Sequence, residues 1–333
     1  MIILKKILKA VFWAIALMVF ILILFSFRKN PEKISYGVSF SKFRAEELGL
    51  SWKDVFISIL DDLKVRNFRL SAHWPMIEPQ KDNYNFEELD FQIKEAEERN
   101  AEVILAVGKR LPSWPECHIP DWAKNLSSEE QEKEILIYIE KVIERYKSYE
   151  NIKYWQVENE PYLSVFAKEQ CGDLDEEFLK EEIALVKKLD PQRKVLITDS
   201  GNLGLWYKAW ARGDVFGTSV YIYLWNPEIG QIKTIYKPFI YKAKTNISSF
   251  LFGKKEALLI ELSLEPWLIE PINNVTLETQ ISRMDINKFA EVIDFAKRTG
   301  FDRQYLWGVE WWHWMKDKGY SEYFDEAKNV FSQ

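Results

Sequence analysis

Short apolar runs alternate with longer amphipathic stretches along nearly the whole sequence after residue 34. Eight of these runs are predicted as strands, because they are short, rich in Val, Ile, Leu and aromatic residues, and mostly lack an alternation of polar and apolar positions. Such continuous apolar runs are typical of strands that are buried on both faces. The predicted strands are 35–40, 66–72, 101–107, 152–157, 194–198, 215–221, 256–260 and 303–308.

The stretches between the strands are charged on one side and apolar on the other, as in surface helices. The regular alternation predicts a parallel sheet with right-handed crossovers, and eight units in about 300 residues favour a closed (β/α)8 TIM barrel. No G-x-G-x-x-G motif follows the first strand, which argues against a dinucleotide-binding fold. Helices are expected over 51–64 (with a capping box at its start), 87–99, 128–146, 175–189, about 204–211, and 277–299 up to Gly300, whereas 228–252 shows no clear pattern.

The N-terminal segment differs from the rest of the sequence. Three lysines lie in the first nine residues, and no charge follows from Ala10 to Phe27. A helix over that run would span roughly 27 Å, about one bilayer core, and no A-x-A-like cleavage site follows it. We therefore expect an uncleaved anchor with its N-terminus inside and the large domain outside the cytoplasm. The predicted organisation is a basic segment (1–9), a transmembrane anchor (10–27), a linker (28–34) and the barrel domain (35–333).

Charge and cysteine content narrow the class of protein further. The net charge is -6 with both signs interspersed, which gives no indication of a nucleic-acid partner. The two cysteines, Cys117 and Cys171, fit a non-cytoplasmic compartment if they pair, and two free thiols are the alternative. They would lie in adjacent loops on one face of the barrel.

Two predicted strands end in carboxylates. Glu158-Asn159-Glu160-Pro161 follows the fourth strand, and Glu261 follows the seventh. In a parallel barrel the carboxyl ends of all strands meet around one mouth, where active sites lie. Either glutamate alone could be a surface residue at a strand end. Two carboxylates that face each other across the mouth are the apparatus of glycoside hydrolysis.

The ordered set of residues around these glutamates resembles the clan A glycoside hydrolases, which are retaining (β/α)8 enzymes, over nearly all of residues 35–312. In that clan an Asn-Glu pair ends the fourth strand with Glu as acid/base, which Asn159-Glu160 matches, and the nucleophile ends the seventh strand, which Glu261 matches. The segment "IELSLEPW" matches no single family's nucleophile motif, so the resemblance assigns the clan and not a family. The resemblance further implies an Arg beside the nucleophile (Arg69), a Tyr that hydrogen-bonds it (Tyr221) and a Trp stacked under the sugar (Trp307).

Other polar residues near the strand ends leave alternatives open. Glu158 competes with Glu160 for the acid role, and Pro161 is expected to hold Glu160 in extended backbone. Asn159 can donate to a sugar 2-hydroxyl, and His73 is the best histidine candidate for a hydroxyl contact. The three histidines, His73, His118 and His313, have no metal-ligand spacing. Further candidates are Glu265, Glu310 and Lys109-Arg110, and eight tryptophans in predicted loops could offer flat faces to a sugar: Trp74, Trp114, Trp122, Trp225, Trp267, Trp311, Trp312 and Trp314.

The resemblance implies a retaining glycosidase that needs no cofactor and acts on a β-linked oligo- or polysaccharide, with Glu160 as acid/base and Glu261 as nucleophile. With residues 10–27 as an anchor, it would be held at a membrane with its catalytic domain outside the cytoplasm. A non-catalytic glycan-binding barrel and a transglycosylase with the same site are the alternatives. The sequence specifies neither the sugar nor the oligomeric state.

Overall fold

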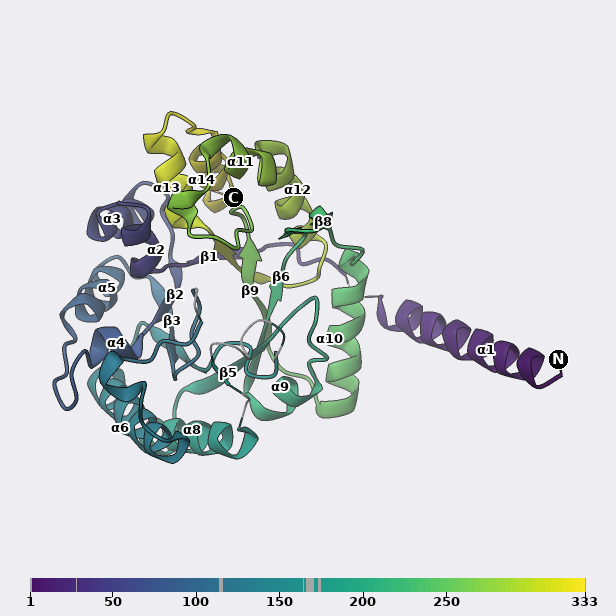
Figure 1. Ribbon diagram of the computed structural model, residues 1–333, viewed down its shortest axis with the longest axis horizontal. Coiled ribbons are helices and arrows are strands. Elements are labelled where there is room, and N and C mark those ends of the chain that lie inside the picture. Colours follow the sequence, from purple (N-terminus) through teal and green to yellow (C-terminus); the bar gives the residue numbers. More distant parts are fainter. Residues whose placement is uncertain are drawn as a thin grey trace.

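The computed structural model describes residues 2–27, 29–113, 116–163, 165, 171–172 and 175–332. Eight parallel strands close into a barrel in the order β1-β10-β9-β6-β5-β4-β3-β2 (Figure 1). The predicted (β/α)8 barrel is therefore confirmed, and each predicted strand lies within about three residues of an observed one. The strands are β1 Ser35–Ser39, β2 Asn67–Ser71, β3 Glu102–Val107, β4 Ile152–Val157, β5 Lys194–Asp199, β6 Val215–Val220, β9 Ala257–Ser263 and β10 Arg303–Trp307.

Helices surround the barrel and cover the outer faces of its strands (Figure 1). A large apolar core lies between strands and helices, and a second, smaller cluster contains Leu196, Leu258 and Tyr305, each nearly or completely buried. Two separate clusters are what strands buried on both faces produce. The helices are α2 Lys42–Glu47, α3 Trp52–Asp61, α4 Trp74–Ile77, α5 Glu87–Glu98, α6 Ser128–Tyr146, α8 Glu176–Leu189, α9 Tyr207–Arg212, α10 Pro238–Phe252, α11 Leu277–Arg283, α12 Ile286–Lys297, α13 Val309–Asp317 and α14 Glu322–Phe331.

Two helical regions differ from the sequence prediction. The single helix expected over 277–299 is two helices, because Asp285 accepts hydrogen bonds from the backbone of Asn287 and Lys288 and so starts α12 anew. The capping box expected at 51–54 is absent, since the side chain of Ser51 makes no cap hydrogen bond to α3.

The region without a clear pattern contains a regular structure. An antiparallel hairpin of β7 Tyr223–Asn226 and β8 Gly230–Lys233 precedes α10 and lies outside the barrel sheet. A two-stranded hairpin has too few residues to show a hydrophobic period, which is why the sequence did not reveal it.

The N-terminal helix α1 Ile2–Phe25 projects from the barrel beside α10 (Figure 1). In the part of the chain that the structure describes, no helix has both the length and the apolar character needed to cross a membrane. The anchor expected over 10–27 is not supported by this finding and stays a prediction; α1 includes the three lysines and ends at Phe25. Some side chains of this segment lie outside the described residues. The last turn contacts α10, where Asn246 Nδ2 donates to the Phe25 carbonyl (2.7 Å).

The tryptophans expected in loops are divided between core and surface. Trp74, Trp311 and Trp312 are completely buried, because they lie in α4 and α13 and pack inward, so their prediction as exposed faces is wrong. Trp114 lies outside the described residues. The half-buried ones are Trp122, Trp225, Trp267 and Trp314.

Candidate active site

The backbone that follows β4 bends sharply at two glutamates. Glu158 and Glu160 adopt positive φ angles of 56° and 44°, which are unusual for residues other than Gly. Hydrogen bonds to both neighbouring strand ends hold this conformation: Asn159 N donates to the Arg110 carbonyl (2.6 Å), and Glu160 N donates to Thr198 Oγ1 (2.7 Å). The extended geometry expected at Glu160 from the following proline is therefore wrong. Strain of this kind concentrates at functional sites.

Arg69 on β2 bonds to residues at the ends of two other strands, β4 and β9. Its side chain is almost completely buried, and it donates from Nη1 to Glu261 Oε2 (2.8 Å) and from Nη2 to Asn159 Oδ1 (2.6 Å). Its Nε donates to Gln156 Oε1 (2.8 Å). Because Arg69 occupies the amide oxygen of Asn159, that side chain can offer its amide nitrogen to a substrate.

Glu261 on β9 is a buried carboxylate with two strong donors. Besides the ion pair with Arg69, its Oε1 accepts a hydrogen bond from the Tyr221 hydroxyl. Burial and the negative charge of Glu261 raise the pKa of Tyr221 well above its usual value, so the phenol keeps its proton and remains a donor. The guanidinium and the hydroxyl together stabilise negative charge on Glu261.

Glu160 has the opposite environment. Its Oε1 accepts from Ser219 Oγ (2.6 Å), a bond that offsets only part of the cost of burial. Burial and the charge of Glu261 raise the pKa of Glu160 to about 8. A carboxyl group with a raised pKa is suited to the acid role, and a neighbouring carboxylate that accepts from a guanidinium and a hydroxyl is suited to the other role in the same reaction.

Glu158 is held away from such a role by the loop after β3. Its two carboxylate oxygens accept from Lys109 N (2.8 Å) and Arg110 N (2.6 Å), and it also hydrogen-bonds with the buried Glu182 of α8. Burial raises the pKa of both carboxyl groups, and the neighbouring Glu158 raises that of Glu182 further. A side chain at Gly108 would lie 2.5 Å from Glu158 Oε1, which shows how closely the loop encloses this carboxyl group. Of the two alternatives left by the sequence, the geometry favours Glu160 over Glu158 as the acid.

Glu265 and Glu310, the other acidic candidates, support the end of β10. Glu265 Oε1 accepts from Trp307 Nε1 (3.1 Å) and from Arg44 Nη2 (3.0 Å), so it orients the half-buried indole. Glu310 is nearly completely buried and accepts from Ser41 N (2.5 Å). All three hydrogen bonds join groups of the protein to one another.

In the structure, His73 packs among other residues of the protein. The ring is buried, its Nε2 lies 3.1 Å from the Pro112 carbonyl oxygen, and it packs against the rings of Phe43 and His118. Burial lowers the pKa of both histidines, that of His118 to about 4, so both are neutral. The contact of His73 with a sugar hydroxyl stays a prediction. Among the described residues, no group of three or more His, Cys, Asp or Glu side chains could hold a metal ion.

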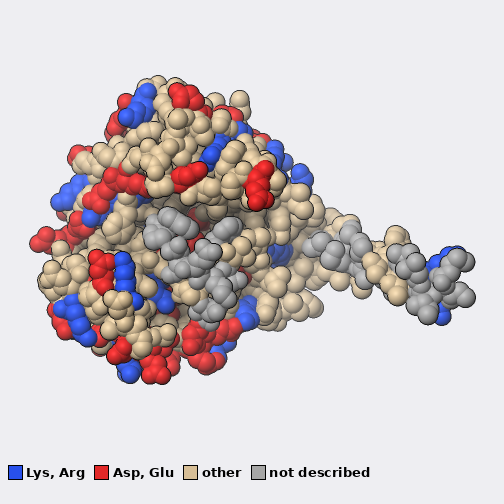
Figure 2. All heavy atoms as spheres, in the orientation of Figure 1, with Lys and Arg blue, Asp and Glu red and all other residues tan. Residues whose placement is uncertain are grey.

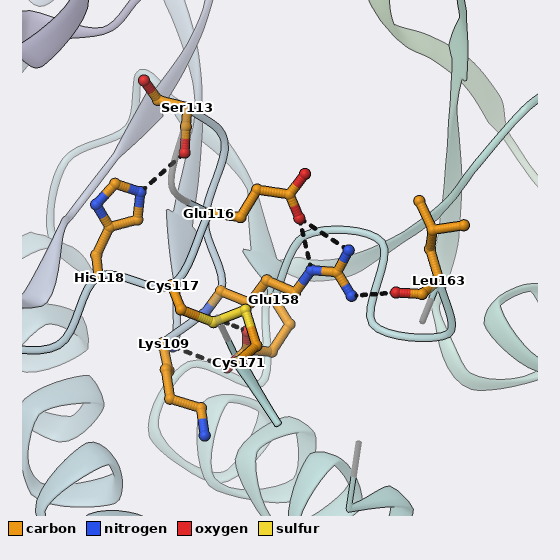
Figure 3. Close-up of a disulfide and its surroundings, with 9 residues drawn as sticks. Lys109, Ser113, Glu116, Cys117, His118, Glu158, Leu163 and Cys171 are labelled. Carbon is orange, nitrogen blue, oxygen red and sulfur yellow. Dashed lines mark hydrogen bonds and ion pairs between the residues drawn. A yellow bond between two sulfur atoms is a disulfide. The ribbon is translucent and has the colours of Figure 1, made fainter. Parts of the chain in front are cut away.

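Sequence reasoning missed several residues that the structure brings to this mouth. Ser219 and Gln156 bond directly to site residues, but a polar residue near a strand end carries no distinctive signal. Other residues of the loop after β3 were considered from the sequence, but not Glu116, which pairs with Arg110. Cys117 in the same loop forms a disulfide with Cys171, with the Cα atoms 5.4 Å apart (Figure 3).

Comparisons with known proteins point to glycosidases. Residues 67–202 match the family described as Glycosyl hydrolase family 10. A search of curated proteins gives no match. Among solved structures, a β-galactosidase from Rahnella sp. R3 has a TM-score of 0.60 at 12% identity, over 92% of this chain and 56% of that chain. GH5_18 from Bifidobacterium longum subsp. longum ATCC 55813 has a TM-score of 0.58 at 12% identity, over 83% and 70% of the two chains. Xylanase 10B from Thermotoga petrophila RKU-1 has a TM-score of 0.52 at 14% identity, over 83% and 82%.

At these identities the structural likeness concerns the fold, whereas the match over 67–202 is a likeness in sequence. That segment runs from β2 to just beyond β5 and includes the Asn159-Glu160 pair. The fold and the family match agree with the resemblance drawn from the sequence. The chain is therefore a glycosidase with the barrel of the clan A glycoside hydrolases.

Proposed function

We propose that this protein is a retaining glycoside hydrolase that cleaves a β-linked glycan by double displacement, with Glu160 as acid/base and Glu261 as nucleophile. The observation that carries the proposal is the contrast between the two buried carboxyl groups. Arg69 and Tyr221 donate to Glu261, whereas burial and the charge of Glu261 raise the pKa of Glu160 to about 8. Glu160 is therefore suited to donate a proton at neutral pH, and the two donors on Glu261 suit it to attack.

The reaction follows from these roles in two steps. In the first, a Glu261 oxygen bonds to the anomeric carbon while the glycosidic bond breaks, and the Glu160 proton passes to the departing oxygen. In the second, Glu160 takes a proton from a water molecule, whose oxygen bonds to the same carbon and releases Glu261. Two displacements at one carbon return the original configuration.

Neighbouring residues complete the proposed site. Asn159 would donate its amide hydrogen to the sugar 2-hydroxyl, a contact that strengthens in the transition state. Trp307, oriented by Glu265, would supply the apolar face under the sugar ring. The guanidinium of Arg69 bonds to both Asn159 and Glu261, so it fixes the positions of these two side chains relative to each other.

The substrate class is supported by the neighbours and by the surface. The Thermotoga petrophila xylanase was solved with xylobiose, and GH5_18 was solved with Manb1-4GlcNAc. Over the described part of the face in Figure 2, acidic and basic side chains are interspersed. This pattern agrees with a glycan substrate and differs from the basic stripe of a nucleic-acid-binding protein.

The experiment is to follow the anomeric signals by ¹H NMR during hydrolysis, after a panel of aryl β-glycosides and polysaccharides has identified a substrate. The β-anomer should appear first and then mutarotate. The α-anomer as first product would refute retention, and no turnover of any glycoside would favour the binding barrel. Products longer than the substrate would favour the transglycosylase. A Glu160→Gln, Glu261→Gln double variant is the control.

We also propose that the barrel works outside the cytoplasm. The disulfide between Cys117 and Cys171 supports this, because such bonds persist in oxidising compartments. The test is to trap thiols with an alkylating reagent as cells are lysed, before and after reduction. Modification of both cysteines without prior reduction would contradict the proposal.

A further inference from the structure

The loop after β3 folds back on itself and brings a third carboxylate to the mouth of the barrel. Arg110 and Cys117 form an antiparallel bridge, Leu111 N donates to the Glu116 carbonyl (2.8 Å), and Glu116 N donates to the Ser113 carbonyl (2.7 Å). Glu116 itself adopts a positive φ of 68°. Because both ends of this turn are hydrogen-bonded, the position of Glu116 is determined by the fold.

Besides the two backbone amides that donate to Glu158, three contacts tie this loop to the segment that carries the proposed acid. The Arg110 carbonyl accepts from Asn159 N (2.6 Å), and Arg110 Nη1 donates to the Leu163 carbonyl (2.7 Å). The disulfide at Cys117 fastens the residue next to Glu116 to Cys171 (Figure 3). These contacts hold the loop that carries Glu116 against the segment that carries Asn159 and Glu160.

Among the described residues, the carboxylate of Glu116 bonds to Arg110 through one of its two oxygens. Its Oε2 lies 2.9 Å from Arg110 Nε and 2.8 Å from Arg110 Nη2, and Figure 3 shows the other oxygen turned away from that pair. The side chain is 23% exposed, so part of it is open to solvent. Its charge contributes to the raised pKa of Glu160 and of Tyr221, and the charge of Glu261 contributes to the raised pKa of Glu116. Glu116 therefore lies near both proposed catalytic glutamates.

On the basis of the proposed function, we infer that Glu116 is a substrate-binding residue that selects neutral sugars. Its free oxygen can only accept a hydrogen bond, which suits a ring hydroxyl of the sugar bound beside Asn159 and Glu160. A uronic acid would bring its own negative charge against the carboxylates of Glu116 and Glu261. The guanidinium of Arg110 already pairs with Glu116 and donates to the Leu163 carbonyl, so it is not available as the partner of a uronate carboxylate.

The test separates binding from turnover. The parent is Glu160→Gln, and Glu116→Ala and Glu116→Gln are added to it. Binding of xylotriose, cellotriose and mannotriose is measured by calorimetry and tryptophan fluorescence, together with the C6-oxidised uronic acid form of cellotriose. Glu116→Ala should raise Kd for the neutral sugar that the parent binds by about tenfold or more, because a hydrogen bond to a charged group is lost. Glu116→Gln should bind the uronic acid form at least several-fold more tightly than the parent does.

A matched control and a folding check complete the design. Glu144→Ala removes a glutamate of α6 from an exposed ion pair with Lys147 and should leave every Kd unchanged. Thermal unfolding and a thiol assay show whether each variant keeps its fold and disulfide, and the isosteric Glu116→Gln stands in if Glu116→Ala fails. A Kd within twofold of the parent in both Glu116 variants would overturn the inference, as would a parent that binds none of these sugars. Wild-type turnover in Glu160→Gln would instead refute the proposed function, without affecting the comparison of Kd values.

Discussion

Replacing Glu261 by alanine should lower kcat on a glycoside by about 10⁴- to 10⁶-fold, the range typical of a lost covalent nucleophile. The reason is that no other described carboxylate at the mouth has the donors that prepare Glu261 for attack. Arg69 and Tyr221 both bond to it, while Ser219 bonds to Glu160 and backbone amides bond to Glu158. The measurement is the steady-state turnover of an aryl β-glycoside.

The chemistry of rescue identifies the role of Glu261 more sharply than the loss of rate. Small anions such as azide can enter the space left by the side chain and attack the anomeric carbon directly, which gives a glycosyl azide of inverted configuration. The matched control is Glu256→Ala, which removes a glutamate just before β9, at the opposite end of that strand from Glu261, and should leave kcat nearly unchanged. Turnover of Glu261→Ala within tenfold of the wild type would remove Glu261 from the nucleophile role.

The barrel was predictable because its strands are buried on both faces and therefore read as continuous apolar runs. β4 was predicted over 152–157, as it is observed. The break between α11 and α12 was not predictable in the same way, because the amphipathic period continues through Met284 and Asp285 and hides the new helix start. Trp311 and Trp312 were wrongly predicted to lie in a loop. They belong to α13, which starts directly after Gly308 and turns both indoles into the core.

The residues of the candidate site could be predicted from their positions at strand ends, but the hydrogen bonds between them could not. Sequence position put Arg69, Asn159, Glu160 and Glu261 at one mouth. It could not show that a single guanidinium bonds both Asn159 and Glu261. Glu116 was missed, because only a turn with a positive φ and a disulfide beside it bring that carboxylate to the mouth. Loop residues of this kind depend on long-range contacts that no local pattern records.

The structure was also needed to decide which of Glu158 and Glu160 takes the acid role. The two residues are separated by one position, and both have positive φ angles, so strand parity does not apply to them. What distinguishes them is their partners. The amides of the β3 loop and Glu182 engage Glu158, whereas Ser219 Oγ donates to Glu160, which lies close enough to Glu261 for the charges to interact.

Replacing Glu160 by alanine should therefore slow glycosides with poor leaving groups by about 10²- to 10⁴-fold, because general acid catalysis contributes most where the departing oxygen is most basic. Glycosylation by an activated substrate such as a nitrophenyl glycoside needs little protonation and should survive better. In the wild type, kcat/KM should fall as pH rises through about 8, since the proton that Glu160 must donate is lost there. Glu160→Ala should lack this alkaline limb.

Azide and a second variant test whether the acid is Glu160 or Glu158. With Glu160 absent and Glu261 present, azide can attack the glycosyl-enzyme in place of activated water, so turnover should recover with retained configuration. This is the opposite stereochemistry to that expected for Glu261→Ala. The comparison variant is Glu158→Ala, tested on one activated and one natural-type substrate, each with and without azide. Near wild-type activity in Glu160→Ala, with a large loss and azide rescue in Glu158→Ala, would move the acid role two residues upstream, to the carboxyl group that the β3 loop encloses.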